Sequence, residues 1–563
     1  MSIYRLSFRL SCIFLCIGFL ISCQGKSGKQ ADTIADTPRE MQEKATSLIK
    51  DLISTAQSSG RLPGDTITIL KQLPVSSVIY ANNNYVPVWS FEEQWKPAGD
   101  SLFHFIEQAQ LYGLFPEDYH FERIKEMRDK FAADTLAKAE RKDAMLWSAA
   151  DMMLTDAFVQ LVRDIKLGRL PQDSITLRKD SVLADSFYVH QLNEVLQSGS
   201  LTKTMEALEP GHTGYQLLKK GIAQFLGTKD DHQYTFVPSR QAAGFSAALQ
   251  HRLFEGGFIA FDSIQADSAQ LAQAVKKFQQ EKNITVDGVA GEGTIRMLNT
   301  SDREKFIRIA ISMDKYKMLP EKMPARYIWV NASANYLDVV DGGEVKLTSK
   351  VICGKAKTRT PVLSSLINTL ITYPQWVPPP SIVSKEILPA VKKNPGYLAR
   401  KGFSLVNSKG EEVDPYSVDW SKYSKGIPYR IVQGSGDANA LGIMKFVFDN
   451  KFSVYLHDTN QRYLFANSMR SLSHGCVRVQ EWDKLAWYIL RNDSANAKGG
   501  NYTKIDSVKT WLGNKQKRNI VLKNKIPVYI RYITCEGKNN GIVFYDDVYG
   551  EDKMLREKFF ASK

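Results

Sequence analysis

The stretch "KFSVYLHDTNQRYLFANSMRSLSHGCVRVQEWDKLAWYIL" (residues 451–490) holds two of the chain's eight histidines and one of its six cysteines. In its first part, the apolar residues Phe452, Val454 and Leu456 alternate with other residues, which predicts a strand with one face in a hydrophobic core. His457 then lies at the end of this strand, on the opposite face. The stretch therefore begins inside a β-sheet.

The last part of the same stretch predicts a helix. Apolar residues recur every three or four positions from Trp482 to Ile489, so we expect the helix to begin near Gln480. Cys476 then lies shortly before the N-terminus of a helix, with Arg478 two residues further along. Both features favour a thiolate over a thiol.

Cys476 and His457 are a candidate nucleophile and its general base. An unperturbed thiol is only a few per cent ionised at neutral pH, and a histidine within hydrogen-bonding reach removes that limit. Gly475 allows a backbone conformation that other residues avoid, so nearby N–H groups can point at a developing oxyanion. These residues favour acyl transfer. Two histidines and a cysteine also suit zinc, but no fourth ligand is evident, so we expect no metal site.

The first 30 residues predict export. Two arginines precede an apolar run of roughly a dozen residues, which is too short to span a bilayer and indicates a secretory signal over residues 1–22. The run ends in "LISC", which resembles a bacterial lipobox and predicts lipidation of Cys23; an ordinary signal peptide is the alternative. Residues 23–39 are polar and predict a flexible tether. We therefore expect a periplasmic protein with a lipid anchor in a bacterial envelope membrane.

Three cysteines remain after the signal and the lipidation site are set aside: Cys353, Cys476 and Cys535. In an oxidising compartment this odd number leaves at least one thiol unpaired, and a bridge between Cys353 and Cys535 stays open. The formal net charge of +14 is spread thinly along the chain. It suits a solvated surface, or a partner polymer that carries carboxylates or phosphates.

The chain before residue 325 predicts helices. Residues 40–237 carry apolar side chains at helical spacing without a catalytic pattern, and are interpreted as a scaffold domain. Residues 238–300 predict a compact module, with an amphipathic helix around Phe278, a turn "VDGVAGEG" and a short last helix. A helix within residues 301–324 is expected to act as a linker.

From residue 325 to 552 the pattern becomes strand-like and predicts a mostly antiparallel β domain, with Asp341-Gly342 as a hairpin turn. An insertion over about residues 380–428 is too long for a turn, and such insertions are often lids or binding loops. Residues 553–563 are expected to form a tail. The fold class predicted is therefore a multidomain α+β protein.

The pattern that runs from His457 to the run "SHGCVR" at Ser473–Arg478 resembles the signature of L,D-transpeptidases, exported cysteine enzymes with a YkuD-type β fold. The segments "RYIWVN", "TPVLSSLINTLITYPQWVPPPSIVSKEILP", "NPGYLARKGF" and "NALGIMKFVFDNKFSVYLHDT" extend the resemblance to the large subfamily with a helical scaffold and a lidded catalytic domain. The segment "AVKKFQQEKNITVDGVAGEGTIRMLN" resembles the three-helix peptidoglycan-binding module of cell-wall enzymes. The resemblance covers most of residues 40–552; the lipobox departs from many relatives.

The resemblance implies roles for individual residues. Cys476 would be the nucleophile, His457 its general base, and the backbone carbonyl of Asp458 would orient the imidazole. The oxyanion hole would be shaped by Ser473, His474 and Gly475. Substrate binding would fall to Arg478, which positions the site or a substrate carboxylate, and to residues that line the donor groove, namely Asn439, Gly442, Lys445 and Tyr455.

The resemblance also implies an activity. Cys476 would attack the third residue of a peptidoglycan stem, expel the terminal D-alanine and pass the acyl group to another stem, forming a 3→3 cross-link without any cofactor. Carbapenems would acylate the same thiol. Hydrolysis of the thioester would instead make an L,D-carboxypeptidase; a peptidase acting on protein and a wall-binding lipoprotein without activity are further alternatives. Expected partners are donor and acceptor stems, the membrane and cell-wall synthesis proteins, and no nucleic acid.

Overall fold

The structure is a computed structural model that describes residues 33–137, 142–173, 175–178, 182–230, 232–260, 262, 268–282, 284–496, 502–539 and 541–563. The predicted signal, the predicted lipidation site at Cys23 and most of the predicted tether lie outside the described residues. Among the residues described, no helix combines the length and the apolar character needed to cross a bilayer.

The chain divides into two compact units. The first consists of residues 1–96 and 123–153, and the second of residues 97–122 and 154–563. The first unit contains α1 (Pro38–Ala56), α2 (Leu73–Asn82), most of α4 (Phe121–Leu136) and the start of α5 (Ala144–Lys166). It also contains two short antiparallel pairs, β1 (Ile34–Ala35) with β4 (Lys142–Asp143) and β2 (Ser90–Phe91) with β3 (Gln94–Trp95).

Two features of this unit are the pairing of β1 with β4 and the buried carboxylate of Asp151. Residues of β1 were expected to belong to a flexible tether, but they pair as a strand because β4 offers them hydrogen-bonding partners. The buried carboxylate of Asp151 accepts hydrogen bonds from the Tyr80 hydroxyl at 2.7 Å and from the backbone N–H groups of Val88, Trp89 and Ser90 at 2.8–2.9 Å. The turn after α2 is thus held by one carboxylate.

The second unit begins with further helices: α3 (Pro97–Glu107), the rest of α5, α6 (Asp185–Ser198), α7 (Leu201–Glu206), α8 (Thr213–Thr228), α9 (Phe245–Glu255), α10 (Ser268–Glu281), α11 (Glu292–Leu298) and α12 (Asp302–Lys317). The predicted helical N-terminal region is confirmed. Helices α9, α10 and α11 enclose a small hydrophobic core of their own, as expected for a compact module.

One glutamine ties this three-helix module together. The buried Gln279 amide donates to the Asp287 carboxylate at 2.8 Å, to the Val289 carbonyl at 3.1 Å and to the Thr294 hydroxyl at 3.1 Å. Its oxygen accepts from the Gly288 N–H at 2.9 Å. The Phe-Gln, Asp-Gly and Thr positions that carried the resemblance are therefore joined in one hydrogen-bond network between α10, the turn and α11.

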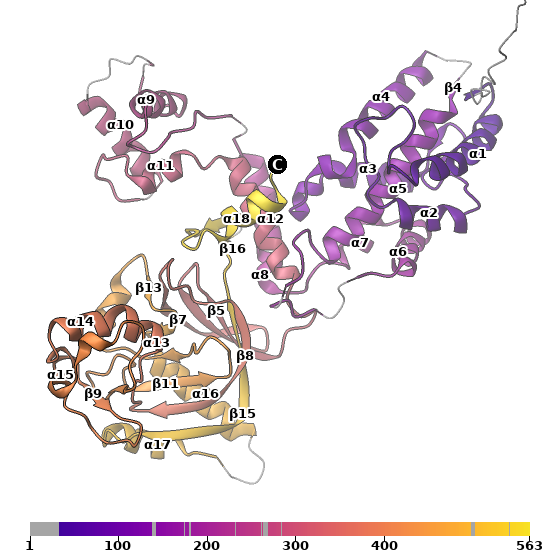
Figure 1. The fold of residues 1–563 in the computed structure, drawn as a ribbon. Coiled ribbons are helices and arrows are strands. Elements are labelled where there is room, and N and C mark those ends of the chain that lie inside the picture. The colour runs from indigo at the N-terminus through magenta and orange to yellow at the C-terminus, as the bar shows by residue number, and fades with distance from the viewer. Residues whose placement is uncertain are drawn as a thin grey trace, which may run out of the picture. The chain divides into compact units, whose positions relative to one another are not determined.

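The chain from residue 326 to 531 folds around a nine-stranded sheet in the order β13-β7-β14-β12-β11-β8-β15-β5-β6, and β6 pairs with β7 as well (Figure 1). Most neighbours are antiparallel, as predicted; the pairs β12–β14, β13–β7 and β15–β5 are parallel. Helix α16 packs through its apolar side against the same core as the sheet. The strands and helices are β5 (Arg326–Asn331), β6 (Tyr336–Asp341), β7 (Glu344–Gly354), β8 (Leu363–Thr372), β11 (Met444–Phe448), β12 (Leu456–His457), β13 (Ser471–Ser473), β14 (Val477–Val479), β15 (Arg518–Arg531), α16 (Trp482–Asn496) and α17 (Ile505–Gly513).

The predicted hairpin at residues 341–342 is present. Asp341 pairs with Glu344, so Gly342 and Gly343 form a two-residue loop between β6 and β7. Both glycines have positive φ angles, 63° and 83°, which the favoured hairpin turn requires. The sheet register at this end is therefore set by local turn chemistry.

The strand expected over residues 451–457 is shorter than its alternating pattern indicates. Only Leu456 and His457 lie in β12, and Phe452, expected in the core, is 49% exposed. The Asn450 side-chain oxygen accepts from the N–H groups of Phe452 and Val454 at 3.0 Å, and Ser453 has a φ of 57°. This side-chain turn competes with strand pairing and turns the Ser453 carbonyl out of the ladder.

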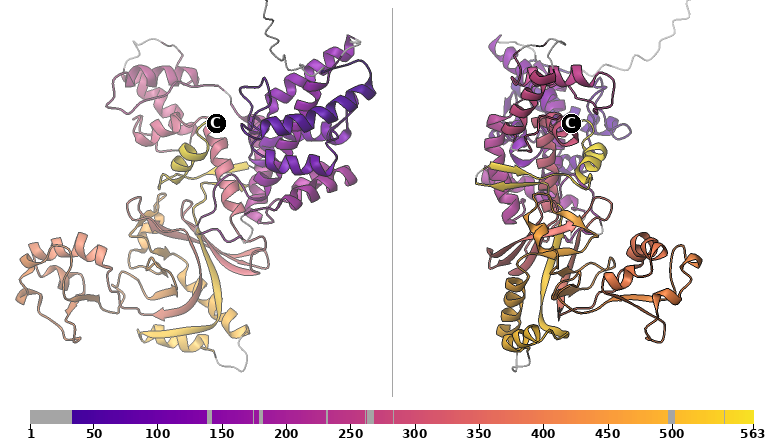
Figure 2. Two further views of the ribbon diagram at one scale, coloured as in Figure 1. Left: turned by 45° about the vertical axis from the view of Figure 1, so that its right-hand side comes forward. Right: turned by 90° about the vertical axis from the view of Figure 1, so that its left-hand side faces the viewer.

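The predicted insertion forms a small subdomain, here called the lid, between β8 and β11. It contains α13 (Pro380–Ile382), the π-helical turn η3 (Val383–Ile387), α14 (Leu388–Lys393), α15 (Tyr397–Arg400) and the paired strands β9 (Phe403–Val406) and β10 (Arg430–Gln433). A separate hydrophobic cluster fills it. Figure 2 shows these elements gathered in one orange body.

The helix expected within residues 301–324 is present as α12, whereas the tail expected over residues 553–563 is wrong. Buried residues occur on nearly every side of α12. The expected tail is mostly helix α18 (Glu551–Phe559), which follows the hairpin of β16 (Cys535–Lys538) and β17 (Gly541–Phe544). Arg556 of α18 pairs with Glu304 of α12 at 2.8 Å, and Phe560 is fully buried. Most residues of α18 are charged, so the sequence did not indicate that this segment packs against the rest of the chain.

We expect Gln279→Ala to loosen the three-helix module without affecting the rest of the chain. Loss of the buried amide leaves the Asp287 turn without its partners, which should cost about 2 kcal/mol and raise local hydrogen exchange about thirtyfold. Mass spectrometry of peptides over residues 274–298 measures this in the full chain. Gln280→Ala, at the neighbouring exposed position, is the control; equal protection in the two variants would contradict the assignment.

Candidate active site

Three neighbouring strands bring the candidate residues to one face of the sheet. Lys445 of β11 pairs with His457 of β12, and His457 pairs with Arg478 of β14. One residue earlier along these strands, the Val477 N–H donates to the Tyr455 carbonyl at 3.1 Å, so Cys476 lies beside Tyr455. Since side chains alternate between faces, Lys445, Tyr455, His457, Cys476 and Arg478 share one face.

His457 is a buried and neutral base. Its Nδ1 lies 2.5 Å from the backbone carbonyl oxygen of Asp458 and donates to it, so Nε2 carries the free lone pair. Burial lowers the imidazole pKa to about 3; the charges of Arg478 and Lys445 act in the same direction, and the carbonyls of Asp458 and Leu441 oppose it. The ring is therefore unprotonated throughout the neutral range.

Cys476 is half-buried, and its thiol lies 3.9 Å from the Ser453 carbonyl oxygen. Burial raises the pKa of the thiol, against the effects of hydrogen bonds from Tyr455 and of the positive charges of Lys445 and Arg478. The described residues include no direct hydrogen bond between Cys476 and His457. The resting arrangement is thus a neutral thiol and a neutral imidazole on the same face of the sheet.

The sequence expectation of a thiolate stabilised by a helix N-terminus is wrong. Strand β14 lies between Cys476 and α16, which begins only at Trp482. A helix end acts within about one turn, so it contributes little at this distance along the chain. The positive charge near the sulfur comes from Arg478, as the sequence indicated, and from Lys445, which strand pairing places on the same face.

The loop from Ser473 to Cys476 is held by its own backbone. The Ser473 hydroxyl donates to the Cys476 carbonyl at 2.6 Å and accepts from the Gly475 N–H at 3.1 Å. Gly475 has a φ of 119°, which other residues rarely adopt. Because its N–H is already engaged, the donors left for an oxyanion are the N–H groups of His474 and Cys476, which have no acceptor among the described residues.

The loop is also supported by residues that the sequence interpretation missed. The Thr358 hydroxyl donates to the Ser473 carbonyl at 2.9 Å, and the buried Thr360 hydroxyl donates to the Gly475 carbonyl at 2.9 Å. The Tyr549 hydroxyl donates to the Gly354 carbonyl at 3.0 Å and accepts from the Thr360 N–H at 3.2 Å. No local pattern in the sequence marks these residues, because they act through fold contacts over distances of 115 residues and more.

The side chain of Asp458 fixes the backbone before β11, a role that the sequence analysis did not predict. Its buried carboxylate accepts from Arg462 at 2.6 and 3.1 Å and from the Ile443 N–H at 3.1 Å. A Cβ on Gly442, whose φ is 61°, would lie 2.2 Å from the Asp458 carboxylate oxygen. Gly442 is therefore needed for the close approach of the segment that orients His457.

The sequence interpretation expected Asn439 to line an open groove, but the residue is buried. Its side chain donates to the Gly434 carbonyl at 2.8 Å and accepts from the Leu441 N–H at 2.8 Å. These bonds hold the loop that precedes β11. Asn439 and Gly442 thus hold the backbone beside the candidate site.

Arg478, Lys445 and Tyr455 remain as groups that can meet a ligand. Arg478 donates to Gln461 at 3.0 Å, but its buried Nε has no hydrogen-bond partner. The Lys445 ammonium lies 3.8 Å from the centre of the Tyr455 ring, and burial lowers its pKa. A carboxylate beside the exposed end of the Arg478 guanidinium would accept charge-assisted hydrogen bonds.

The other two cysteines do not pair. Cys353 and Cys535 are free, buried and packed in different clusters, and burial raises the pKa of each to about 12. Among the described residues, Cys476 is therefore the one cysteine whose side chain is not fully buried. No group of three or more metal-binding side chains lies together in the described part of the chain.

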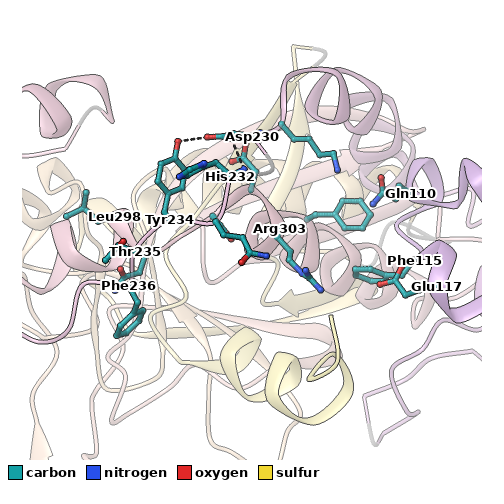
Figure 3. A pocket seen from close by; sticks show the side chains of 16 residues that line it. Gln110, Phe115, Glu117, Asp230, His232, Tyr234, Thr235, Phe236, Leu298 and Arg303 are labelled. Carbon is teal, nitrogen blue, oxygen red and sulfur yellow. Dashed lines mark hydrogen bonds between the residues drawn. The ribbon is translucent and has the colours of Figure 1, made fainter. Parts of the chain in front are cut away.

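Two cavities lie outside this face. One of about 500 Å³ is lined mainly by residues 229–236 and the start of α12, where the Tyr234 hydroxyl points at Asp230 (Figure 3). Another of about 650 Å³ lies within the lid, and its exposed cations Lys409, Lys425 and Arg430 face no lining carboxylate. Neither includes Cys476 or His457, so neither is the site of the thiol chemistry.

Comparison with known proteins identifies three domains. Residues 325–494 match the family described as "L,D-transpeptidase catalytic domain" (YkuD), residues 77–222 the family "Scaffold domain", and residues 247–298 the family "Putative peptidoglycan binding domain". A Haemophilus influenzae protein described as "Putative L,D-transpeptidase" is 32% identical over 248 residues, which cover 44% of this chain and 48% of that protein. The chain thus matches about half the length of that relative.

One solved structure, described as "Structure of the Ldtfm-avibactam carbamoyl enzyme", matches with 11% sequence identity and a TM-score of 0.15. The match covers 39% of this chain and 61% of that chain. At this score the similarity supports no conclusion about the fold or the site.

We expect Gly442→Ala to abolish activity while the chain stays folded. The new Cβ collides with the Asp458 carboxylate and favours a negative φ, so the His457 segment must shift; the strain amounts to about 2 kcal/mol. Activity and thermal unfolding are measured together. Gly434→Ala, in the same loop with no heavy atom near its Cβ, is the control, and an active Gly442→Ala enzyme would contradict the assignment.

The raised thiol pKa predicts slow labelling of Cys476 by iodoacetamide at neutral pH. Because the pKa of the Cys476 thiol is raised, the reactive thiolate is scarce at neutral pH, and the labelling rate should climb as the pH is raised into the alkaline range. Peptide mass spectrometry identifies the labelled residue, since Cys353 and Cys535 titrate near 12. A rate that is already maximal at pH 7 would show that the resting state is a thiolate.

Proposed function

We propose that this chain, which carries an L,D-transpeptidase catalytic domain together with scaffold and peptidoglycan-binding domains, forms 3→3 cross-links in peptidoglycan. The observation that carries the proposal is the shared face of Cys476 and His457, with the His457 Nε2 left free by the Asp458 carbonyl. This geometry suits a neutral imidazole that takes the thiol proton as the sulfur attacks.

In the acylation step, the Cys476 sulfur attacks the carbonyl carbon of the third stem residue, and its proton passes to Nε2 of His457. The oxyanion that forms is stabilised by the N–H groups of His474 and Cys476. As the tetrahedral intermediate collapses, the C–N bond to D-alanine breaks. His457 returns the proton to the leaving amine, and a thioester remains on Cys476.

In the second step, the side-chain amine of another stem attacks the thioester carbonyl. His457 accepts a proton from that amine, the C–S bond breaks, and the sulfur recovers the proton as a thiol. The resulting amide is the cross-link. The nearby charges of Lys445 and Arg478 stabilise the sulfur whenever it carries negative charge.

Arg478 is proposed to bind a carboxylate of the donor stem. Its guanidinium shares the face of Cys476 and His457, and a peptidoglycan stem brings carboxylates to the site. The cations of the lid cavity, Lys409, Lys425 and Arg430, have the charge that suits the same polymer. We further propose that the chain is exported and held at an envelope membrane through a lipid on Cys23, which brings the domain to its substrate.

We expect cells without the protein to lose 3→3 cross-linked dimers, and Cys476→Ala to fail to restore them. Removal of the nucleophile should lower the rate at least about a thousandfold, because no other group can form the thioester. Mass spectrometry of digested cell wall measures the dimers. Cys353→Ala, a change to a buried and unreactive thiol, is the control.

The same measurement separates the alternatives. If dimers persist unchanged and trimmed tripeptide stems fall instead, water is the acceptor and the chain is an L,D-carboxypeptidase. If neither product changes, the transpeptidase proposal is wrong and a wall-binding role without catalysis replaces it.

A further inference from the structure

One contact joins the lid to the loop that carries Cys476. The His474 Nε2 lies 2.5 Å from a carboxylate oxygen of Glu386, an ion pair when the imidazole is protonated and a hydrogen bond when it is neutral. Glu386 belongs to the lid turn η3, whereas His474 lies two residues before Cys476. Two segments 88 residues apart in the sequence thus meet beside the nucleophile.

The lid presents Glu386 on an unusual turn. Residues 383–387 form a π-helix, a conformation that is rare and frequent at functional sites. Its cause lies in the sequence, because Pro389 has no N–H to donate to the carbonyl of Lys385, and its ring crowds that carbonyl. The neighbouring Ile387 and Leu388 are buried in the lid core, so the widened turn projects Glu386 outward on a fixed base.

His474 differs from its neighbours in what holds it. Ser473 and Gly475 are bonded to residues 355–360 of the catalytic domain, and Cys476 to Ser473. The only partner of the His474 side chain among the described residues is Glu386. The lid therefore contacts the loop at His474, whose side chain has no other partner among the described residues. The His474 N–H has no protein acceptor there either.

We propose that Glu386 is a positioning residue that acts through His474 and couples the seating of the lid to the geometry of the catalytic loop. With the carboxylate in place, the imidazole and hence the backbone of His474 are fixed, and its N–H is aimed for the oxyanion. When the lid moves away, this restraint is lost and acyl transfer slows. The kinetic part of the proposal rests on the proposed function; the mechanical coupling does not.

A double-mutant cycle tests the coupling. Glu386→Ala and His474→Ala should each lower kcat for a tetrapeptide donor about two- to fivefold, the effect expected of a partly exposed ion pair. The double variant should be no slower than the slower single variant, because both changes remove one contact. Glu386→Gln keeps an oxygen acceptor and should recover part of the rate. Effects that multiply in the double variant would overturn the proposal.

Hydrogen exchange provides a readout that needs no turnover. In Glu386→Ala, exchange should rise both in peptides over residues 380–393 and in peptides over residues 470–480, while KM changes less than kcat. Glu412→Ala, an exposed lid carboxylate without a recorded side-chain partner, should leave both regions unchanged. If only the lid peptides respond, the contact does not position the loop and the proposal fails. If the parent chain forms no cross-links but both regions respond together, the proposed function fails and the coupling stands.

Discussion

The parallel pairing of β12 with β14 is the constraint on which the site depends. It aligns Leu456 with Val477 and His457 with Arg478. The side chains of His457 and Arg478, and those of Tyr455 and Cys476 two residues earlier, therefore point to a common face. A shift of this register by one residue would send His457 to the opposite face from Cys476. The apolar partners Leu456 and Val477 are fully buried, and the cost of exposing them holds the register in place.

Burial then sets the chemistry of the pair. A thiol and an imidazole taken out of water both favour their neutral forms, which the directions of the pKa shifts of Cys476 and His457 reflect. The cations Lys445 and Arg478 stabilise negative charge on the Cys476 sulfur and destabilise positive charge on the His457 ring. The site is thus arranged so that charge separation is completed during attack on a carbonyl and not before it.

Several residues of the motifs support the site from behind. Asn439 and Gly442 hold the loop before β11, the carboxylate of Asp458 fixes that loop through Arg462, and Gln279 does equivalent work in the three-helix module. A recurring residue pattern therefore reports on the architecture around a reactive group as much as on contact with a ligand. The Glu386–His474 contact adds a support that crosses from the lid.

The sequence by itself determined the succession of a helical region, a three-helix module and a β domain with a lid, because hydrophobic period and turn residues are local properties. It also marked Cys476 and His457 as candidates through their spacing. Only the tertiary structure decided that Phe452 is exposed, that the C-terminus is a packed helix and that Lys445 joins Arg478 beside the sulfur. These outcomes depend on which strands and helices become neighbours, and long-range pairing leaves no periodic trace in the chain.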